Sequence, residues 1–164
     1  MIEEKNIIFD KRSTIKQIEE GIVLCPKFNK EGLIPCITIE DNSKEILMFS
    51  YLNEEALKKS ISSAKAHYYS RSRRNIWFKG EISGMTHDIQ NILIDDDQDS
   101  IIFVVRLNKP FKGGNVASCH VGYKSCFYRK VKITEDKISL EFTENEKAFD
   151  PEVIYEGIDN PTKI

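Results

Sequence analysis

Short runs of β-branched and aromatic residues, separated by polar turns, dominate the pattern of this chain. Such runs are typical of β-strands, whereas an amphipathic helix needs apolar residues spaced three to four positions apart. The predicted strands cover residues 33–39, 45–51, 67–70, 76–78, 89–94, 101–107, 127–133 and 138–142. Strands therefore make up most of the regular structure that we expect.

Helical spacing is found in two places. One helix is predicted to begin after Asn53, because asparagine is a favourable N-cap and two glutamates follow it at the positive end of the helix. A second, short helix belongs to an N-terminal arm, with Ser13 or Thr14 as its cap and Gly21 as its end.

Strands outnumber helices and no internal repeat is visible, so we expect an α+β fold with a mainly antiparallel sheet and few helices. A chain of 164 residues has the size of one compact domain. We divide it into an N-terminal arm (1–20), a main domain (21–142) and a polar C-terminal tail (143–164).

The charge balance excludes some partners. The chain has 24 basic and 26 acidic residues, a net charge of -2, which argues against a nucleic-acid polymer as partner. No apolar run approaches the roughly 20 residues of a membrane span, and the charged N-terminus lacks the apolar core of a secretory signal. We therefore expect a cytoplasmic protein without a membrane partner, and a small anionic ligand remains compatible with local basic clusters.

Cysteine spacing suggests a metal site. In a reducing compartment, metal binding or a core position is expected of Cys25, Cys36, Cys119 and Cys126 rather than disulfides. Cys119 and Cys126 flank a glycine turn, and two thiolates can converge there on a soft ion such as zinc. Two thiolates do not complete a four-ligand set, so the ion would need further ligands. A pair of buried core cysteines is the alternative. His120, next to the first thiol, is a candidate proton carrier.

Carboxylates cluster directly after the predicted strand 89–94. If the chain stays extended there, alternation places Asp95, Asp97 and Asp99 on one face and Asp96 on the other. Oxygen ligands crowded in this way suit a hard cation such as Mg²⁺. A solvated acidic turn is the alternative interpretation.

A basic run joins the two aromatic strands. Arg71, Ser72 and Arg73, together with Lys79, offer guanidinium, hydroxyl and ammonium groups that suit phosphate oxygens. A solvated turn would show the same composition.

Taken together, these segments resemble the phosphoribosyl-AMP cyclohydrolases, which open the purine ring in histidine biosynthesis. The resemblance runs in order over roughly residues 20–132. Its most specific parts are Ser-Arg-Ser-Arg at 70–73, Trp-x-Lys-Gly-Glu-x-Ser-Gly at 77–84 and Cys-His-x-Gly-x-x-Ser-Cys-Phe-Tyr-Arg at 119–129. Some relatives carry a second, pyrophosphohydrolase domain at the C-terminus. The short segment after Arg129 leads us to expect the monofunctional form.

The resemblance implies an intertwined homodimer whose active sites combine residues of both subunits. It also implies two metals, a zinc ion bound by three cysteines and a magnesium ion bound by aspartates. In this chain the magnesium ligands would be Asp95, Asp97 and Asp99.

The acidic motif departs from the family pattern. In the family it usually reads Asp-Cys-Asp-x-Asp, and its cysteine is the third zinc ligand, whereas this chain has Asp96 at that position. A carboxylate can bind zinc, so we expect the zinc ligands to be Cys119, Cys126 and Asp96, the last from the same chain or its partner. The alternatives for the third position are Cys25, Cys36, His87 and His120.

The implied reaction is hydrolysis of the N1–C6 bond of the adenine ring of phosphoribosyl-AMP, with His120 moving the proton. The residues expected to contact the substrate and its phosphates are Arg71, Ser72, Arg73, Lys79 and Ser83. One alternative is another zinc hydrolase of purine nucleotides, such as a deaminase, although the deaminase signature His-x-Glu with Pro-Cys-x-x-Cys is absent. The other is a metal-stabilised nucleotide-binding module without catalysis.

Overall fold

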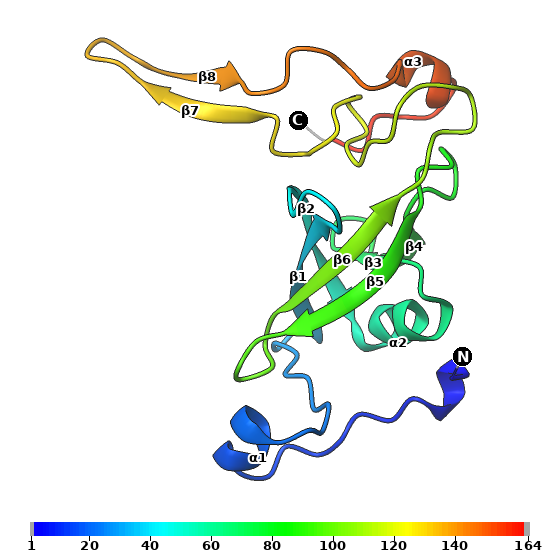
Figure 1. The fold of residues 1–164 in the computed structure, drawn as a ribbon, viewed down its shortest axis with the longest axis vertical. Coiled ribbons are helices and arrows are strands. Elements are labelled where there is room, and N and C mark those ends of the chain that lie inside the picture. Colours follow the sequence, from blue (N-terminus) through cyan, green and yellow to red (C-terminus); the bar gives the residue numbers. More distant parts are fainter. Residues whose placement is uncertain (1, 163–164) are drawn as a thin grey trace.

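A six-stranded sheet with the order β4-β3-β2-β1-β6-β5 forms the centre of the computed structural model, which describes residues 2–162 (Figure 1). The strands are β1 (Leu33–Glu40), β2 (Ile46–Asn53), β3 (His67–Ser70), β4 (Asn75–Phe78), β5 (His87–Ile94) and β6 (Ile101–Leu107). Neighbours run antiparallel except for β1 and β6, which are parallel. The predicted α+β fold with a mainly antiparallel sheet is confirmed.

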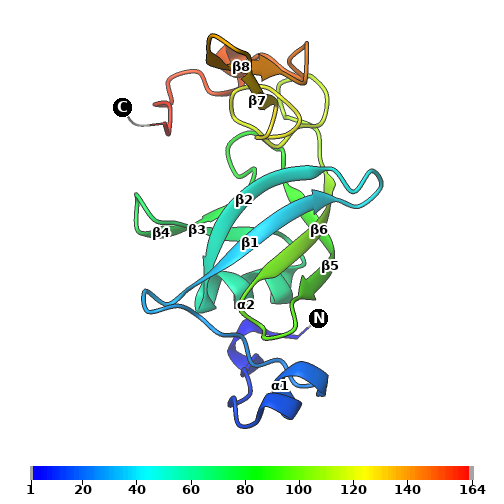
Figure 2. The same ribbon diagram turned by 90° about the vertical axis from the view of Figure 1, so that its left-hand side faces the viewer.

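One face of the sheet is covered by α2 (Glu54–Ser63), as Figure 2 shows. The helix begins where the sequence predicted, because Asn53 Oδ1 accepts a hydrogen bond of 2.8 Å from the amide of Ala56. It ends at Ala64, which has a left-handed backbone conformation. The core between helix and sheet includes Leu52 and Tyr68, both fully buried.

The N-terminal arm contains a 3₁₀ turn (Glu4–Asn6) and the short helix α1 (Ile15–Glu20). Thr14 caps α1 by accepting a hydrogen bond of 3.1 Å from the amide of Gln17, and Gly21 is its C-cap. Both predicted ends of this helix are confirmed.

The opposite face of the sheet, which we call the outer sheet face, is apolar and open in a single chain. Ile37 of β1 pairs with Phe49 of β2, and these side chains are 37% and 48% exposed. Leu93 of β5 is also exposed. Large apolar residues on the open face of a sheet are typical of a contact surface.

Two further strands, β7 (Arg129–Ile133) and β8 (Ile138–Phe142), pair only with each other and form a hairpin. Figure 1 shows this hairpin extending to one side, beyond the end of the main sheet. Val131 lies opposite Leu140 and Ile133 opposite Ile138, so all four share one face, and all four are exposed. The hairpin therefore carries a second uncovered apolar surface.

The segment expected to be a polar tail contains the helix α3 (Pro151–Ile154), capped by Asp150. Phe149 and Ile154 are buried and pack with Met85 and Ala117 in a second, small core. Scattered apolar residues in a polar segment carry too little periodicity to predict such a core.

Candidate active site

The cysteine loop, which we define as residues 118–126, folds back on itself. The amide of Cys119 donates to the carbonyl of Tyr123 at 3.2 Å, and the amide of Ser118 donates to that of Lys124 at 2.8 Å. Gly122 has a φ of +110°, a backbone conformation that residues with a side chain rarely adopt. This turn brings the thiols of Cys119 and Cys126 within hydrogen-bonding reach of each other.

One hydrogen bond between the two thiols shifts their pKa values in opposite directions. The hydrogen bond with Cys126 lowers the pKa of Cys119 to about 7. The same hydrogen bond raises the pKa of Cys126. Near neutral pH Cys119 is therefore partly a thiolate, in a position suited to a soft cation.

Lys79 lies beside the thiols. Its side chain is buried, and its Nζ donates to the carbonyl oxygen of Ser118 at 2.9 Å. Burial lowers the pKa of Lys79 to about 8, although the neighbouring thiols Cys126 and Cys119 oppose this shift. The ammonium group therefore faces the cysteine loop.

His120 has a buried Nε2 with no hydrogen-bond partner among the described residues. Burial lowers the pKa of His120, so its imidazole is neutral near pH 7 and able to accept a proton. A buried nitrogen without a partner is costly unless a ligand satisfies it.

These groups line a pocket of about 750 Å³, large enough for a nucleotide. Arg73, Trp77, Lys79, Ser83, His120 and Cys126 form one side of it. The opposite wall comes from residues 151–161, which include α3.

Asp95, Asp97 and Asp99 lie together, with ligand atoms within 4.8 Å of one another. The expected grouping is present, but its cause is a turn and not an extended strand: the amide of Gln98 donates to the carbonyl of Asp95 at 3.2 Å, and Gln98 has a φ of 58°. Lys27 Nζ bridges Asp97 at 3.0 Å and Asp99 at 3.1 Å. We call residues 95–99 the acidic turn.

Asp95 has its own partners. Its carboxylate accepts hydrogen bonds from the amides of Asp99 and Ser100 and from Ser100 Oγ at 2.9, 3.0 and 2.6 Å. Burial alone would raise the pKa of Asp95, but the hydrogen bonds from Ser100 and Asp99 outweigh it and lower that pKa. Asp95 is therefore an ionised carboxylate that also shapes the turn.

Sequence reasoning missed the residues that hold the acidic turn. The buried side chain of Gln98 accepts from the amide of Cys25 at 2.8 Å and donates to the carbonyls of Ile18 and Val23. Arg12 donates to the carbonyl of Asp97 at 2.8 Å. A lone glutamine or arginine in a polar segment gives no signal for contacts over such distances along the chain.

The acidic turn and the cysteine loop of one chain lie far apart. The amide of Cys126 donates to the carbonyl of Leu47, at the start of β2. The neighbouring Ile46 of β2 pairs with Ile39 of β1, and Ile39 pairs with Val104 of β6. Along the chain, Val104 and Asp99 are separated by roughly 16 Å if the segment is extended. Across the sheet, β2 and β6 are two strand spacings apart, which is roughly 10 Å. Figure 1 shows the β5–β6 turn and the segment near residue 120 at opposite ends of the sheet. Since zinc ligands lie about 2.0–2.3 Å from the ion, Asp96 and the thiols of one chain cannot bind the same metal.

The structure also shows where the other candidates for the third zinc ligand lie. Cys36 lies in the main core, and burial raises its pKa to about 12. Cys25 is buried beside Gln98. His87 is buried in the sheet, where its Nδ1 bonds to the hydroxyl of Tyr68 at 3.2 Å. His120 is the alternative that lines the pocket with Cys126.

The structure divides the basic run between two pockets. Arg73, Lys79 and Ser83 line the pocket of the cysteine loop. Arg71 and Ser72 line a second pocket of about 770 Å³, where the Arg71 guanidinium lies 4.3 Å from the centre of the Tyr51 ring. The turn between β3 and β4 thus points Arg73 to the side opposite Arg71 and Ser72.

A nucleotide-sized pocket that contains a buried lysine, a neutral histidine and one thiol of a pair is typical of metal-dependent enzymes that act on small molecules. The family comparison agrees with this class. Residues 48–128 match the family model described as phosphoribosyl-AMP cyclohydrolase. None of the helices in residues 2–162 is long and apolar enough to cross a membrane.

Curated relatives named phosphoribosyl-AMP cyclohydrolase extend this match to most of the chain. The protein of Rhodopseudomonas palustris strain BisB18 is 42% identical over 144 residues, which cover 87% of this chain and 94% of the relative. The Rhizobium etli protein is 39% identical over 92% of this chain and 97% of its own length. That of Chlorobium limicola is 40% identical over 85% and 94%. This chain belongs to the phosphoribosyl-AMP cyclohydrolase family, as its motifs predicted.

Proposed function

We propose that this protein hydrolyses the adenine ring of phosphoribosyl-AMP at the N1–C6 bond, as a step of histidine biosynthesis. The names of its relatives support the reaction. The observation that carries the proposal is Cys126, which pairs with the thiol of Cys119 and lines a nucleotide-sized pocket together with Lys79 and His120.

The donors at the cysteine loop fit a zinc ion. Two adjacent sulfur atoms, one with a pKa near 7, are soft ligands of the kind that zinc prefers. Nε2 of His120, which has no partner among the described residues, lies in the same pocket and is left for proton transfer. When bound, zinc supplies a Lewis acid that makes water a competent nucleophile near neutral pH.

The third ligand is proposed to be Asp96 of a second copy in a homodimer. In one chain Asp96 is exposed and lies far from the thiols, so only another subunit can bring it to them. Two apolar surfaces, the outer sheet face and the apolar side of the hairpin, are open to such a contact. In a twofold-symmetric dimer each cysteine loop meets the partner's acidic turn once, which gives two equal sites.

Magnesium is proposed at Asp95, Asp97 and Asp99. Their oxygens are close enough to share one hard cation. The single ammonium group of Lys27 pairs with Asp97 and Asp99, so the cation must displace it.

The residues of the pocket have separate roles in the reaction. Water adds its oxygen to C6 and the N1–C6 bond breaks. Of the two protons of water, one ends on N1 and the other on the exocyclic nitrogen, so that C6 becomes a carboxamide carbon. Neutral His120 takes the proton from water and returns it to N1. Arg73 and Ser83 line the pocket where they can contact the substrate.

Phosphate binding is proposed for both pockets. Arg73 serves the pocket of the cysteine loop, and Arg71 with Ser72 serves the second pocket. Two separate basic positions suit a substrate with two phosphate groups. Lys79 contributes positive charge near the thiols, where its Nζ already has a protein partner.

The test is a turnover assay with purified protein, phosphoribosyl-AMP, zinc and magnesium. Ring opening changes the absorbance of the base without releasing ammonia. We expect repeated turnover that stops when a chelator removes the metals. Binding without an absorbance change, or release of ammonia, would contradict the proposed reaction.

A further inference from the structure

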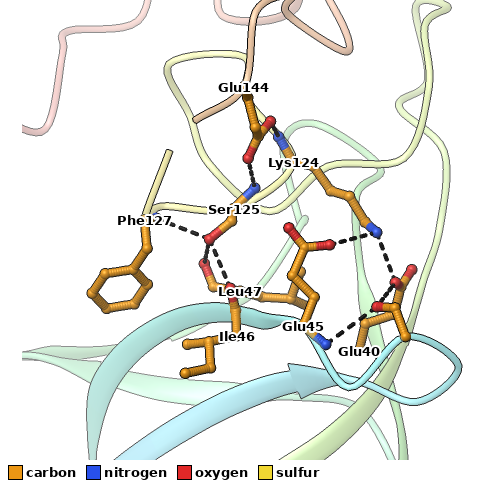
Figure 3. Close-up of polar contacts among 9 residues, drawn as sticks. Glu40, Glu45, Ile46, Leu47, Lys124, Ser125, Phe127 and Glu144 are labelled. Atoms are coloured by element: carbon orange, nitrogen blue, oxygen red, sulfur yellow. Dashed lines mark hydrogen bonds and ion pairs between the residues drawn. The ribbon is translucent and has the colours of Figure 1, made fainter. Parts of the chain in front are cut away.

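Glu144 lies just after β8, outside the segment that matches the family model. Its two carboxylate oxygens accept hydrogen bonds from the backbone amides of Lys124 and Ser125, at 2.8 and 3.0 Å (Figure 3). The next residue is Cys126. One side chain therefore holds two successive amides at the end of the cysteine loop.

The same end of the loop is anchored to β2 from the other side. Ser125 Oγ donates to the carbonyl of Ile46 at 2.7 Å, and the amide of Cys126 donates to that of Leu47 at 2.7 Å. Figure 3 shows Ser125 between Glu144 and these two carbonyl groups. Cys126 is thus fixed between the strand and the segment that follows β8.

Lys124 strengthens this arrangement. Its Nζ pairs with Glu40 at 2.7 Å and with Glu45 at 2.8 Å, both at the turn between β1 and β2. Its backbone amide donates to Glu144. A carboxylate is the strongest acceptor for such an amide, because charge-assisted hydrogen bonds are roughly twice as strong as neutral ones.

We propose that Glu144 is a positioning residue that holds Cys126 in place for zinc, an inference that rests on the proposed function. The carboxylate clamps the backbone on the N-terminal side of Cys126, so the thiol meets Cys119 before any metal binds. Residues behind the direct ligands commonly tune metal sites in this way, and their loss costs 10–100-fold in affinity.

The experiment measures zinc affinity of the full-length protein by competition with a chelator, together with the melting temperature without metal. Glu144→Gln keeps the shape but has only one acceptor oxygen, and Glu144→Asp keeps the charge but is one methylene shorter. Glu146→Gln, at an exposed position two residues later, is the matched control. We expect zinc binding to weaken about 10–100-fold in both Glu144 variants and to stay within about twofold of wild type in the control.

Three outcomes would overturn the inference. In the first, a folded Glu144→Gln melts early but binds zinc as tightly as wild type, so the role is structural only. In the second, Glu144→Gln binds zinc more tightly than wild type, so that the negative charge of Glu144, which raises the pKa of both thiols, matters more than the clamp. In the third, the Lys124 and Ser125 amides of wild type exchange rapidly with solvent, a measurement that needs no variant. A wild-type protein that binds no zinc would instead refute the proposed metal centre itself.

Discussion

The cysteine loop and the acidic turn are built in similar ways but differ in the state of their charged groups. Each is held by a segment from one end of the chain, the acidic turn by Arg12 and the cysteine loop by Glu144. The carboxylates of the turn are partly exposed and already paired with Lys27, whereas the thiols lie beside a buried lysine in a pocket. For the two proposed metals the comparison teaches that the thiols are already in place for zinc, whereas Lys27 must leave Asp97 and Asp99 before magnesium binds.

The largest expected effect comes from removing a thiol. Cys119→Ser and Cys126→Ser should each weaken zinc binding by more than about 100-fold, because a direct ligand contributes more than an outer partner. Turnover should fall with the zinc content, while Mg²⁺ binding at the acidic turn should not change. Metal analysis and the ring-opening assay check this, and a variant with full zinc and full activity would remove the cysteine loop from the site.

A substitution at Gly122 should damage the same loop without touching a ligand. A Cβ there would lie 2.9 Å from both the carbonyl oxygen of Phe149 and Cδ of Lys147, at a φ of +110°. Gly122→Ala should destabilise the fold by about 1–3 kcal/mol and weaken zinc binding. Gly113→Ala is the control, because it has an equally unusual φ of +89° but open space around its Cβ position. Equal effects of the two substitutions on zinc affinity would show that the contact with the C-terminal segment is irrelevant.

The sequence predicted local structure well and long-range placement poorly. The caps at Thr14 and Asn53 depend on neighbouring residues, so their signals are local and both are confirmed. The clustering of Asp95, Asp97 and Asp99 was expected for an incorrect reason, because a left-handed residue at Gln98 turns the chain. The role of Glu144 was missed, since nothing near it in the sequence reveals contact with residues 124 and 125.

Acid should weaken zinc binding at the cysteine loop. The hydrogen bond with Cys126 holds the pKa of Cys119 at about 7, and zinc binds the thiolate form. Below that pH protons compete for the sulfur, so affinity should fall at least about tenfold per pH unit between pH 7 and pH 5. Chelator competition at several pH values measures the slope. An affinity independent of pH over this interval would exclude thiolate ligands.

The smallest expected effect is at Lys27, which tests the acidic turn. Lys27→Met removes the ammonium group that bridges Asp97 and Asp99, so Mg²⁺ should bind a few-fold more tightly, in line with the modest strength of exposed ion pairs. Zinc affinity should be unchanged. Calorimetric titration with Mg²⁺ checks the prediction, and weaker Mg²⁺ binding would mean that Lys27 organises the site and does not compete for it.

We propose that the cysteine loop of one subunit and Asp96 of the other form each zinc site. Asp96→Ala and Cys126→Ser should each be inactive alone. In a mixed dimer, co-expressed and purified through two different tags, one site carries both changes and the other carries neither. We predict about half of the wild-type activity for this mixed dimer, with zinc at the intact site. A mixed dimer as inactive as its parents, or an Asp96→Ala homodimer with full zinc and activity, would contradict the shared site.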